Sequence, residues 1–224
     1  MKIEYGFMVL LLGLSVTTYS AASALETDKQ KVSYIMGFQA GSQLQRQGFD
    51  IDLDTMMMAL KDGLSGNQPK LTGEEAAVVM QKFQAEQEAE KASARAENAK
   101  AGAAFLAENK TKTGVIELDN GLQYKVVQAG TGKQPTATDT VTVHYRGTLL
   151  NGKEFDSSYS RNEPINFTVN GVIPGWTQIL QLMKEGAKWH VVIPSDLAYG
   201  PRGAGSDIGP DATLIFDIEL IKVN

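Results

Sequence analysis

Residues 143–161 read VHYRGTLLNGKEFDSSYSR, and this stretch predicts a strand followed by a turn. The apolar residues Val141, Val143 and Tyr145 alternate with polar neighbours, which is the period of a strand that buries one face. The Asn151-Gly152 pair is typical of the turn that ends such a strand. The same alternation recurs later in the chain, at Trp189, Val191, Ile193, Leu214, Phe216, Ile218 and Leu220.

One short helix is expected among these strands, at residues 176–183. Its apolar residues, among them Trp176 and Leu180, recur every three or four positions and therefore share one helix face. Several strands around a single helix indicate an α+β fold, in which an antiparallel sheet wraps around the helix. The strand faces opposite the core are expected to be exposed, and they carry His144, His190 and Val192.

Two shorter helices are predicted between residues 25 and 67. The first begins at a capping box, Thr27 to Gln30, and the second follows Asp52, a suitable N-cap. Gly66 and Pro69 are expected to end the second helix. A zone of about forty residues is too small to bury a core of its own. Pairing with a second copy of the chain would supply the missing burial.

A long helix is predicted from about Thr72 to Lys110. A second capping box, Thr72 to Glu75, marks its start, and no proline follows until Pro135. Between Gln84 and Ala104 every residue is small, amide-bearing or charged, so the segment has no large apolar side chain to bury. We expect a solvated helix that separates two modules, with a disordered tether as the alternative.

The composition excludes several classes of function. A net charge of −5 argues against nucleic-acid binding and against attachment to anionic membranes. The chain has no cysteine and only two histidines, so thiol nucleophiles, disulfides and Cys- or His-ligated metals are not expected. The same count argues against most histidine-dependent acid–base chemistry. We therefore predict no metal and no cofactor.

The N-terminus is typical of a targeting segment. Lys2 precedes an apolar run from Phe7 to Val16, and Ala22-Ser23-Ala24 fits a cleavage site with small residues. We predict a signal peptide at residues 1–24, an exported mature chain and no membrane span after cleavage. The alternative is an uncleaved membrane anchor, although the run is short for a bilayer.

Several blocks of sequence together carry a resemblance to a known family. In order and spacing they resemble the FKBP-type peptidyl-prolyl cis-trans isomerases, over about 110 residues. With the helical N-terminal zone included, the chain resembles the macrophage infectivity potentiator (Mip) group of Gram-negative bacteria, a virulence-associated family. The blocks are Val143–Gly147, Asn151–Ser158, Ser160–Arg161, Val172–Trp176, Met183–Gly186, Ile193–Ser195, Leu197–Gly200 and Ala212–Leu220.

The resemblance implies an FKBP-like half-barrel at residues 113–224, joined by a connecting helix at 72–112 to a dimerisation domain at 25–71. It also implies a homodimer, inhibition by macrolides such as rapamycin, and a place in the periplasm or at the outer membrane or cell surface. The implied catalytic residues are Tyr145, Phe155, Asp156, Trp176 and Tyr199. The implied substrate-binding residues are these five with Arg161, Ile165, Phe167, Val172, Ile173, Ile208 and Phe216.

The family pattern assigns separate roles within this pocket. Trp176 would form the floor under a proline ring, the Tyr199 hydroxyl and the Ile173 N–H would meet substrate carbonyls, and Asp156 would engage Tyr145 and Arg161 at the rim. Two positions depart from the commonest pattern. Ile165 stands where an aromatic residue is frequent, and Ala204 stands where histidine is frequent. We expect both to affect sequence preference more than activity.

Such a pocket suits the rotation of an X-Pro bond. The barrier of roughly 18–20 kcal/mol arises because amide resonance is lost in the twisted state, which is also less polar than the planar amide. An apolar pocket that complements the twisted state lowers the barrier without proton transfer or a covalent bond. We therefore expect a folding enzyme that acts on proline-containing protein or peptide clients. The alternative is a non-catalytic periplasmic chaperone or a surface binding module.

Overall fold

The computed structural model describes residues 25–47 and 49–224. The predicted signal peptide, residues 1–24, lies outside these residues. Within the described part of the chain, no helix combines the length and the apolar character needed to cross a membrane.

Among the described residues, three helices precede the sheet. They are α1 at Asp28–Arg46, α2 at Leu53–Leu64 and α3 at Gly73–Asn109. The chain forms two compact units, and the boundary between them lies within α1. The first unit ends at Gln43 and the second begins at Leu44. The 37 residues of α3 form one continuous helix, which confirms the helical prediction and excludes the disordered tether for this segment.

The predicted caps are present at the starts of α1, α2 and α3. At α1, the Thr27 hydroxyl accepts from the Gln30 N–H at 3.2 Å, and the Gln30 side chain accepts from the Thr27 N–H at 2.9 Å. The Asp52 carboxylate accepts from the Thr55 N–H at 2.7 Å. Thr72 caps α3 with a reciprocal capping box. Because these contacts satisfy N–H groups that have no partner inside the helix, local sequence alone defines the helix starts.

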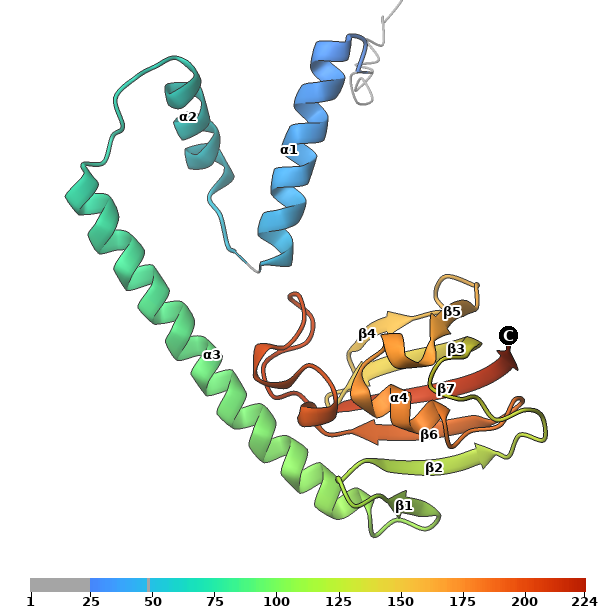
Figure 1. The fold of residues 1–224 in the computed structure, drawn as a ribbon. Helices are drawn as coiled ribbons and strands as arrows, with labels where there is room; N and C mark the ends of the chain where they lie inside the picture. Colours follow the sequence, from blue (N-terminus) through green and yellow to red (C-terminus); the bar gives the residue numbers. More distant parts are fainter. Residues whose placement is uncertain (1–24, 48) are drawn as a thin grey trace, which may run out of the picture. The chain divides into compact units, whose positions relative to one another are not determined.

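The seven strands form one antiparallel sheet in the order β1-β2-β6-β7-β3-β4, and β5 pairs with β3 (Figure 1). The central ladder joins β3 to β7, with Tyr145 opposite Ile218. Helix α4, Pro174–Leu180, lies across one face of this sheet (Figure 1). The strands are β1 Val115–Glu117, β2 Gln123–Gln128, β3 Thr140–Leu149, β4 Glu154–Ser157, β5 Ile165–Thr168, β6 Lys188–Ile193 and β7 Leu214–Val223. Short 3₁₀ turns are η1 Val169–Gly171, η2 Ser195–Leu197 and η3 Gly200–Arg202.

The core lies between α4 and the sheet. The predicted inward faces of the strands are buried, and so are the apolar residues of α4 and its following turn, including Ile179 and Met183. Proline at the first turn of α4 fits its start, because that turn needs no N–H donor. The predicted α+β architecture, an antiparallel sheet wrapped around one short helix, is confirmed.

Three residues on the outer strand faces differ from the prediction. Val192 is 1% exposed, because its ladder partner Gln123 hydrogen-bonds to the Leu106 carbonyl and the end of α3 lies over this strand pair. His144 and His190 are only partly exposed. Each has its Nδ1 atom near an oxygen, Ser158 Oγ at 2.9 Å and Asp217 Oδ1 at 2.8 Å respectively. Strand alternation could not reveal these neighbours, because they come from other elements.

A buried polar network anchors the C-terminal end of α3 to the sheet. The Asn109 amide donates to Gln123 Oε1 at 2.9 Å. The Gln123 amide in turn donates to the Leu106 carbonyl at 2.9 Å and to Glu117 Oε2 at 2.7 Å. Asn109 and Gln123 are buried, so each depends on the other instead of on water.

We predict that Asn109→Ala lowers the free energy of unfolding by about 1–3 kcal/mol, because the buried Gln123 oxygen loses its donor. Urea denaturation followed by circular dichroism measures this change. Asn224→Ala is the matched control, since its side chain donates one exposed hydrogen bond to Thr142. The control should change stability by no more than about 0.5 kcal/mol. Equal effects of the two substitutions would contradict the proposed anchor.

Candidate active site

A cavity of about 500 Å³ opens between α4, the inner face of the sheet and the loop around Tyr199. Most of its lining is aromatic or aliphatic, and Asp156 supplies the one carboxylate among its lining residues. Such a hollow, apolar with few polar groups, is the usual form of a small-molecule or peptide site. The lining residues are Tyr145, Phe155, Asp156, Phe167, Gly171, Val172, Ile173, Trp176, Tyr199 and Phe216.

Trp176 lies at the centre of the aromatic lining. It comes from the first turn of α4 and is 4% exposed. Three rings meet the indole in edge-to-face arrangements: Tyr145 at 5.2 Å, Phe216 at 5.3 Å and Phe167 at 5.8 Å between centroids. These geometries place the positive edge of one ring on the negative face of another, which is favourable. The aromatic lining is therefore held in place before any ligand arrives.

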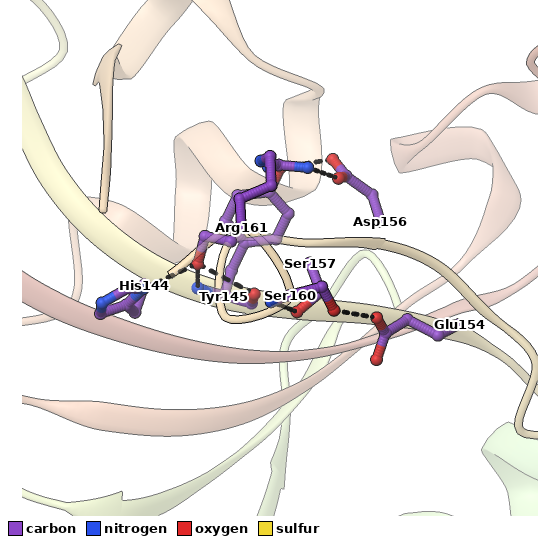
Figure 2. A network of polar contacts seen from close by, with 8 residues as sticks. His144, Tyr145, Glu154, Asp156, Ser157, Ser160 and Arg161 are labelled. Carbon is purple, nitrogen blue, oxygen red and sulfur yellow. Dashed lines mark hydrogen bonds and ion pairs between the residues drawn. The ribbon is translucent and has the colours of Figure 1, made fainter. Parts of the chain in front are cut away.

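A polar group occupies one edge of the cavity. The Tyr145 hydroxyl donates to Asp156 Oδ2. The Arg161 guanidinium donates to Asp156 Oδ1 at 2.7 Å and to the Tyr145 oxygen at 3.0 Å. Figure 2 shows Arg161 beside Asp156. Because Arg161 and Asp156 are each nearly half exposed, solvent screens the charge attraction between them. The two hydrogen bonds of Arg161 therefore contribute more to geometry than to stability.

The same contacts determine the charge states at the rim. Partial burial alone would raise the pKa of Asp156, but hydrogen bonds from Tyr145 and Arg161 outweigh it and hold the pKa below its usual value. Burial, reinforced by Asp156, raises the pKa of Tyr145 to about 12. Burial and the nearby Asp156 also raise the pKa of Tyr199. At neutral pH the site therefore holds one carboxylate and two neutral phenols.

Tyr199 and Ile173 both line the cavity and come from different segments of the chain. Tyr199 stands between the turns η2 and η3 and is 41% exposed, so its ring reaches the opening of the cavity. Ile173 is the residue immediately before α4. Its extended backbone fits the restriction that Pro174 places on a preceding residue.

The structure brings together nine of the twelve predicted site residues as cavity lining. Arg161 lies outside the lining but contacts Asp156 and Tyr145. Ile165 is in β5 and packs against the core, and Ile208 is buried and pairs with Ala204 in a bridge near Pro210. Neither Ile165 nor Ile208 is among the lining residues. Both are apolar residues that also serve the core, which the sequence could not distinguish.

Two glycines belong to the site that sequence reasoning did not single out. Gly171 lines the cavity just before Val172. Gly147 lies behind the aromatic wall, where an added Cβ would stand 2.6 Å from Phe155 Cζ and 2.8 Å from Phe216 Cε1. The Arg146-Gly147 pair inside a strand was the available signal, because glycine within a strand often marks a close approach.

The chemistry of the lining does not suit a metal ion. Asp156 is its one carboxylate, and Arg161 already occupies one oxygen of that group. Among the described residues, no group of three or more acidic, histidine or cysteine side chains could hold an ion.

Comparison with known proteins agrees with this fold. The family model described as FKBP-type peptidyl-prolyl cis-trans isomerase matches residues 131–221. The model described as the domain amino terminal to that isomerase matches residues 29–126. The half-barrel, α4 and the aromatic cavity together define the class of protein. The chain belongs to the FKBP-type peptidyl-prolyl cis-trans isomerase family.

Individual relatives narrow the assignment within that family. The chain is 47% identical to the outer membrane protein MIP of Legionella longbeachae, over 95% of this chain and 94% of that protein. It is 44% identical to the peptidyl-prolyl cis-trans isomerase Mip of Coxiella burnetii, over 96% and 94% respectively. The crystal structure of FkpA from Escherichia coli matches with a TM-score of 0.63 at 37% identity, covering 90% of this chain and 99% of that one. The predicted likeness to the Mip group is confirmed.

We predict that Gly147→Ala destabilises the chain by about 1–3 kcal/mol, because the new methyl group overlaps two aromatic rings. Thermal denaturation measures the loss, and near-ultraviolet circular dichroism should report the displaced aromatic rings. Gly171→Ala is the matched control, because its added Cβ would meet Thr168 at an ordinary 3.7 Å. A Gly147→Ala chain as stable as the control would show that the wall is looser than described.

Proposed function

We propose that this chain is a peptidyl-prolyl cis-trans isomerase that assists the folding of exported, proline-containing protein clients. One observation carries the proposal: an apolar cavity with Trp176 at its centre and, at its edge, Asp156, which accepts hydrogen bonds from Tyr145 and Arg161. Family membership supports the same activity. No metal or cofactor takes part in the proposed reaction.

The physical basis is differential binding of the twisted amide. Resonance places negative charge on the carbonyl oxygen of the planar X-Pro bond, and twisting returns that electron density to nitrogen. Transfer from water to an apolar cavity therefore costs the planar form more than the twisted form. A cavity that binds the twisted form better accelerates rotation in both directions.

We assign the floor and the two carbonyl partners as follows. Trp176 supports the proline ring, and the surrounding aromatic edges keep the indole fixed while the bond rotates. The neutral Tyr199 hydroxyl, at the opening, donates to one substrate carbonyl. The Ile173 N–H, at the start of α4, donates to another. These two donors position the substrate backbone on either side of its proline.

We assign the polar edge to orientation of the rotating carbonyl. Asp156 accepts from the Tyr145 hydroxyl and the Arg161 guanidinium, and these hydrogen bonds hold its pKa below the usual value, so the carboxylate is a weak base. The edge therefore acts by its fixed dipoles, and not as a general acid or base. Phe155, Phe167, Val172 and Phe216 complete the apolar walls.

A non-catalytic chaperone or surface binding module is the second candidate. The exposed apolar residues of α1 and α2 favour a binding role in addition to catalysis, because such surfaces adapt to many partners. Binding and catalysis can coexist in one chain. A measured rate of isomerisation separates the enzyme from a chaperone that lacks activity.

We predict that the mature chain accelerates cis-to-trans conversion in a protease-coupled proline-peptide assay, and that a macrolide such as rapamycin inhibits it. Tyr199→Ala should lower kcat/KM by about tenfold, since one transition-state donor is lost. The variant should keep its circular dichroism spectrum, because Tyr199 is partly exposed. No rate above background in the unsubstituted chain, together with suppression of client aggregation, would instead favour the chaperone.

The N-terminal helices support the further proposal of a homodimer. No residue of α1 or α2 is buried within the chain. Five apolar residues of α1 are each more than half exposed: Val32, Tyr34, Ile35, Met36 and Phe38. Exposed apolar surface of this kind is typical of an interaction site, and a second copy of the chain would bury it in both copies.

We propose residues 25–71 as the dimerisation domain, 72–112 as the connecting helix and 113–224 as the isomerase domain. Export by a signal peptide at residues 1–24 would place the dimer in the periplasm or at the outer membrane or cell surface. Two linked sites could hold one client chain twice, which raises the effective concentration of its prolines at the second site.

We predict that sedimentation of the mature chain gives a dimer and that a chain lacking residues 25–71 gives a monomer. The truncated chain should be monomeric because it lacks the apolar surface of α1 and α2. Activity on a short proline peptide should remain in the monomer, since the cavity lies within residues 113–224. A truncated chain that still sediments as a dimer would place the interface elsewhere.

A further inference from the structure

Ser158 occupies an unusual place at the end of the β3–β4 ladder. The pairing of Arg146 with Ser157 and Gly147 with Asp156 puts Ser158 opposite Tyr145 as the next pair. The Ser158 N–H donates to the Tyr145 carbonyl at 3.0 Å, as an antiparallel ladder requires. The second hydrogen bond of the pair differs from a regular ladder. The Tyr145 N–H donates at 2.8 Å to the Ser158 hydroxyl oxygen and not to the Ser158 carbonyl.

Because the Ser158 hydroxyl accepts the hydrogen bond from the Tyr145 N–H, the Ser158 carbonyl is available to another donor. It accepts from the Glu163 N–H at 3.3 Å, and the Asn162 N–H donates to the Tyr159 carbonyl at 2.9 Å. Asn162 has a φ of 53°, in the left-handed region that asparagine tolerates. The chain therefore leaves the ladder at Ser158 and turns back on itself. That turn brings Arg161 to Asp156 and to the Tyr145 hydroxyl, as Figure 2 shows.

The Ser158 hydroxyl is also completely enclosed and fully used. Ser158 is 0% exposed. Its oxygen lies 2.9 Å from His144 Nδ1 and 3.2 Å from the Tyr145 carbonyl oxygen, in addition to the Tyr145 N–H. A hydroxyl has one proton to donate and two lone pairs, so three partners satisfy it. The His144 ring stacks on Tyr159 at 4.6 Å and closes this region from outside.

We infer that Ser158 is a positioning residue for the isomerase site, with His144 as its support. Its hydroxyl takes the place of a ladder carbonyl, and the loop thus formed holds Arg161 over Asp156 and Tyr145. The inference rests on the proposed function, because its consequence is the orientation of the polar edge during rotation. Sites held by such supporting contacts lose activity when the support is removed, even where no substrate is touched.

The test is a double-mutant cycle with Ser158→Ala and Arg161→Ala. Ser158→Ala alone should lower kcat/KM by about tenfold, mostly through kcat, because the polar edge is misplaced while the apolar walls remain. In the Arg161→Ala background, Ser158→Ala should lower kcat/KM by less than about twofold, because Ser158 acts through Arg161. A full tenfold loss in that background, or a shift confined to thermal stability, would overturn the inference.

Ser160→Ala is the matched control. Ser160 lies in the same loop, but its hydroxyl donates to Glu154 on the exposed side of the loop. Its kcat/KM should stay within about twofold of the unsubstituted chain. A loss equal to that of Ser158→Ala would assign the effect to the loop in general and contradict a specific role for Ser158.

Two His144 variants decide the question if Ser158→Ala does not fold. His144→Phe keeps a ring against Tyr159 but loses the bond to Ser158, and it should lower kcat. His144→Asn places an amide where Nδ1 stands, and it should restore most of the activity. A His144→Phe chain with unchanged kcat would contradict the inference.

A crystal structure of His144→Phe or Ser158→Ala gives a readout that does not depend on turnover. We expect the Arg161 guanidinium to leave Asp156, and an unmoved Arg161 would refute the positioning role. Absence of isomerase activity in the unsubstituted chain would refute the proposed function alone, because the structural readout would still decide the role of Ser158.

Discussion

Tyr145 is held on both edges of its strand and at the end of its side chain. It faces Ile218 in the β3–β7 ladder, its amide donates to Ser158, and its hydroxyl joins Asp156 and Arg161. Its ring meanwhile contacts Trp176 edge to face. One residue thus connects the sheet, the floor of the cavity and the polar edge. The geometry of the site depends on this residue because none of these contacts can shift without disturbing the others.

The cavity combines two requirements that oppose each other. It must be apolar enough to favour a less polar amide, yet it keeps a carboxylate at its edge. Burial of that carboxylate is unfavourable, and hydrogen bonds from Tyr145 and Arg161 offset the cost. The pKa values of the neighbouring phenols shift upward instead, and Tyr145 stays neutral with a pKa of about 12. The edge therefore keeps one charge pattern across the neutral range.

The sequence predicted the elements well because their signals are local. Capping residues such as Thr72 and the alternation along β3 and β7 depend only on near neighbours in the chain. The errors at Val192, His144 and His190 have the opposite origin, since α3, Ser158 and Asp217 reach them from distant positions. For the cavity, family resemblance supplied the aromatic residues, whereas Gly171 and the role of Ser158 emerge only when the loops are placed in space. No sequence period indicates that a hydroxyl replaces a backbone carbonyl.

The central claim is that the cavity promotes rotation through its apolar, fixed environment and without moving a proton. The most direct measurement is kcat/KM for a proline peptide in H2O and D2O, from about pH 7.5 to about pH 9, where neither an acidic carboxyl nor a phenol with a raised pKa titrates. The account predicts a flat profile and a solvent isotope ratio close to one. A bell-shaped profile, or a rate that falls severalfold in D2O, would contradict it.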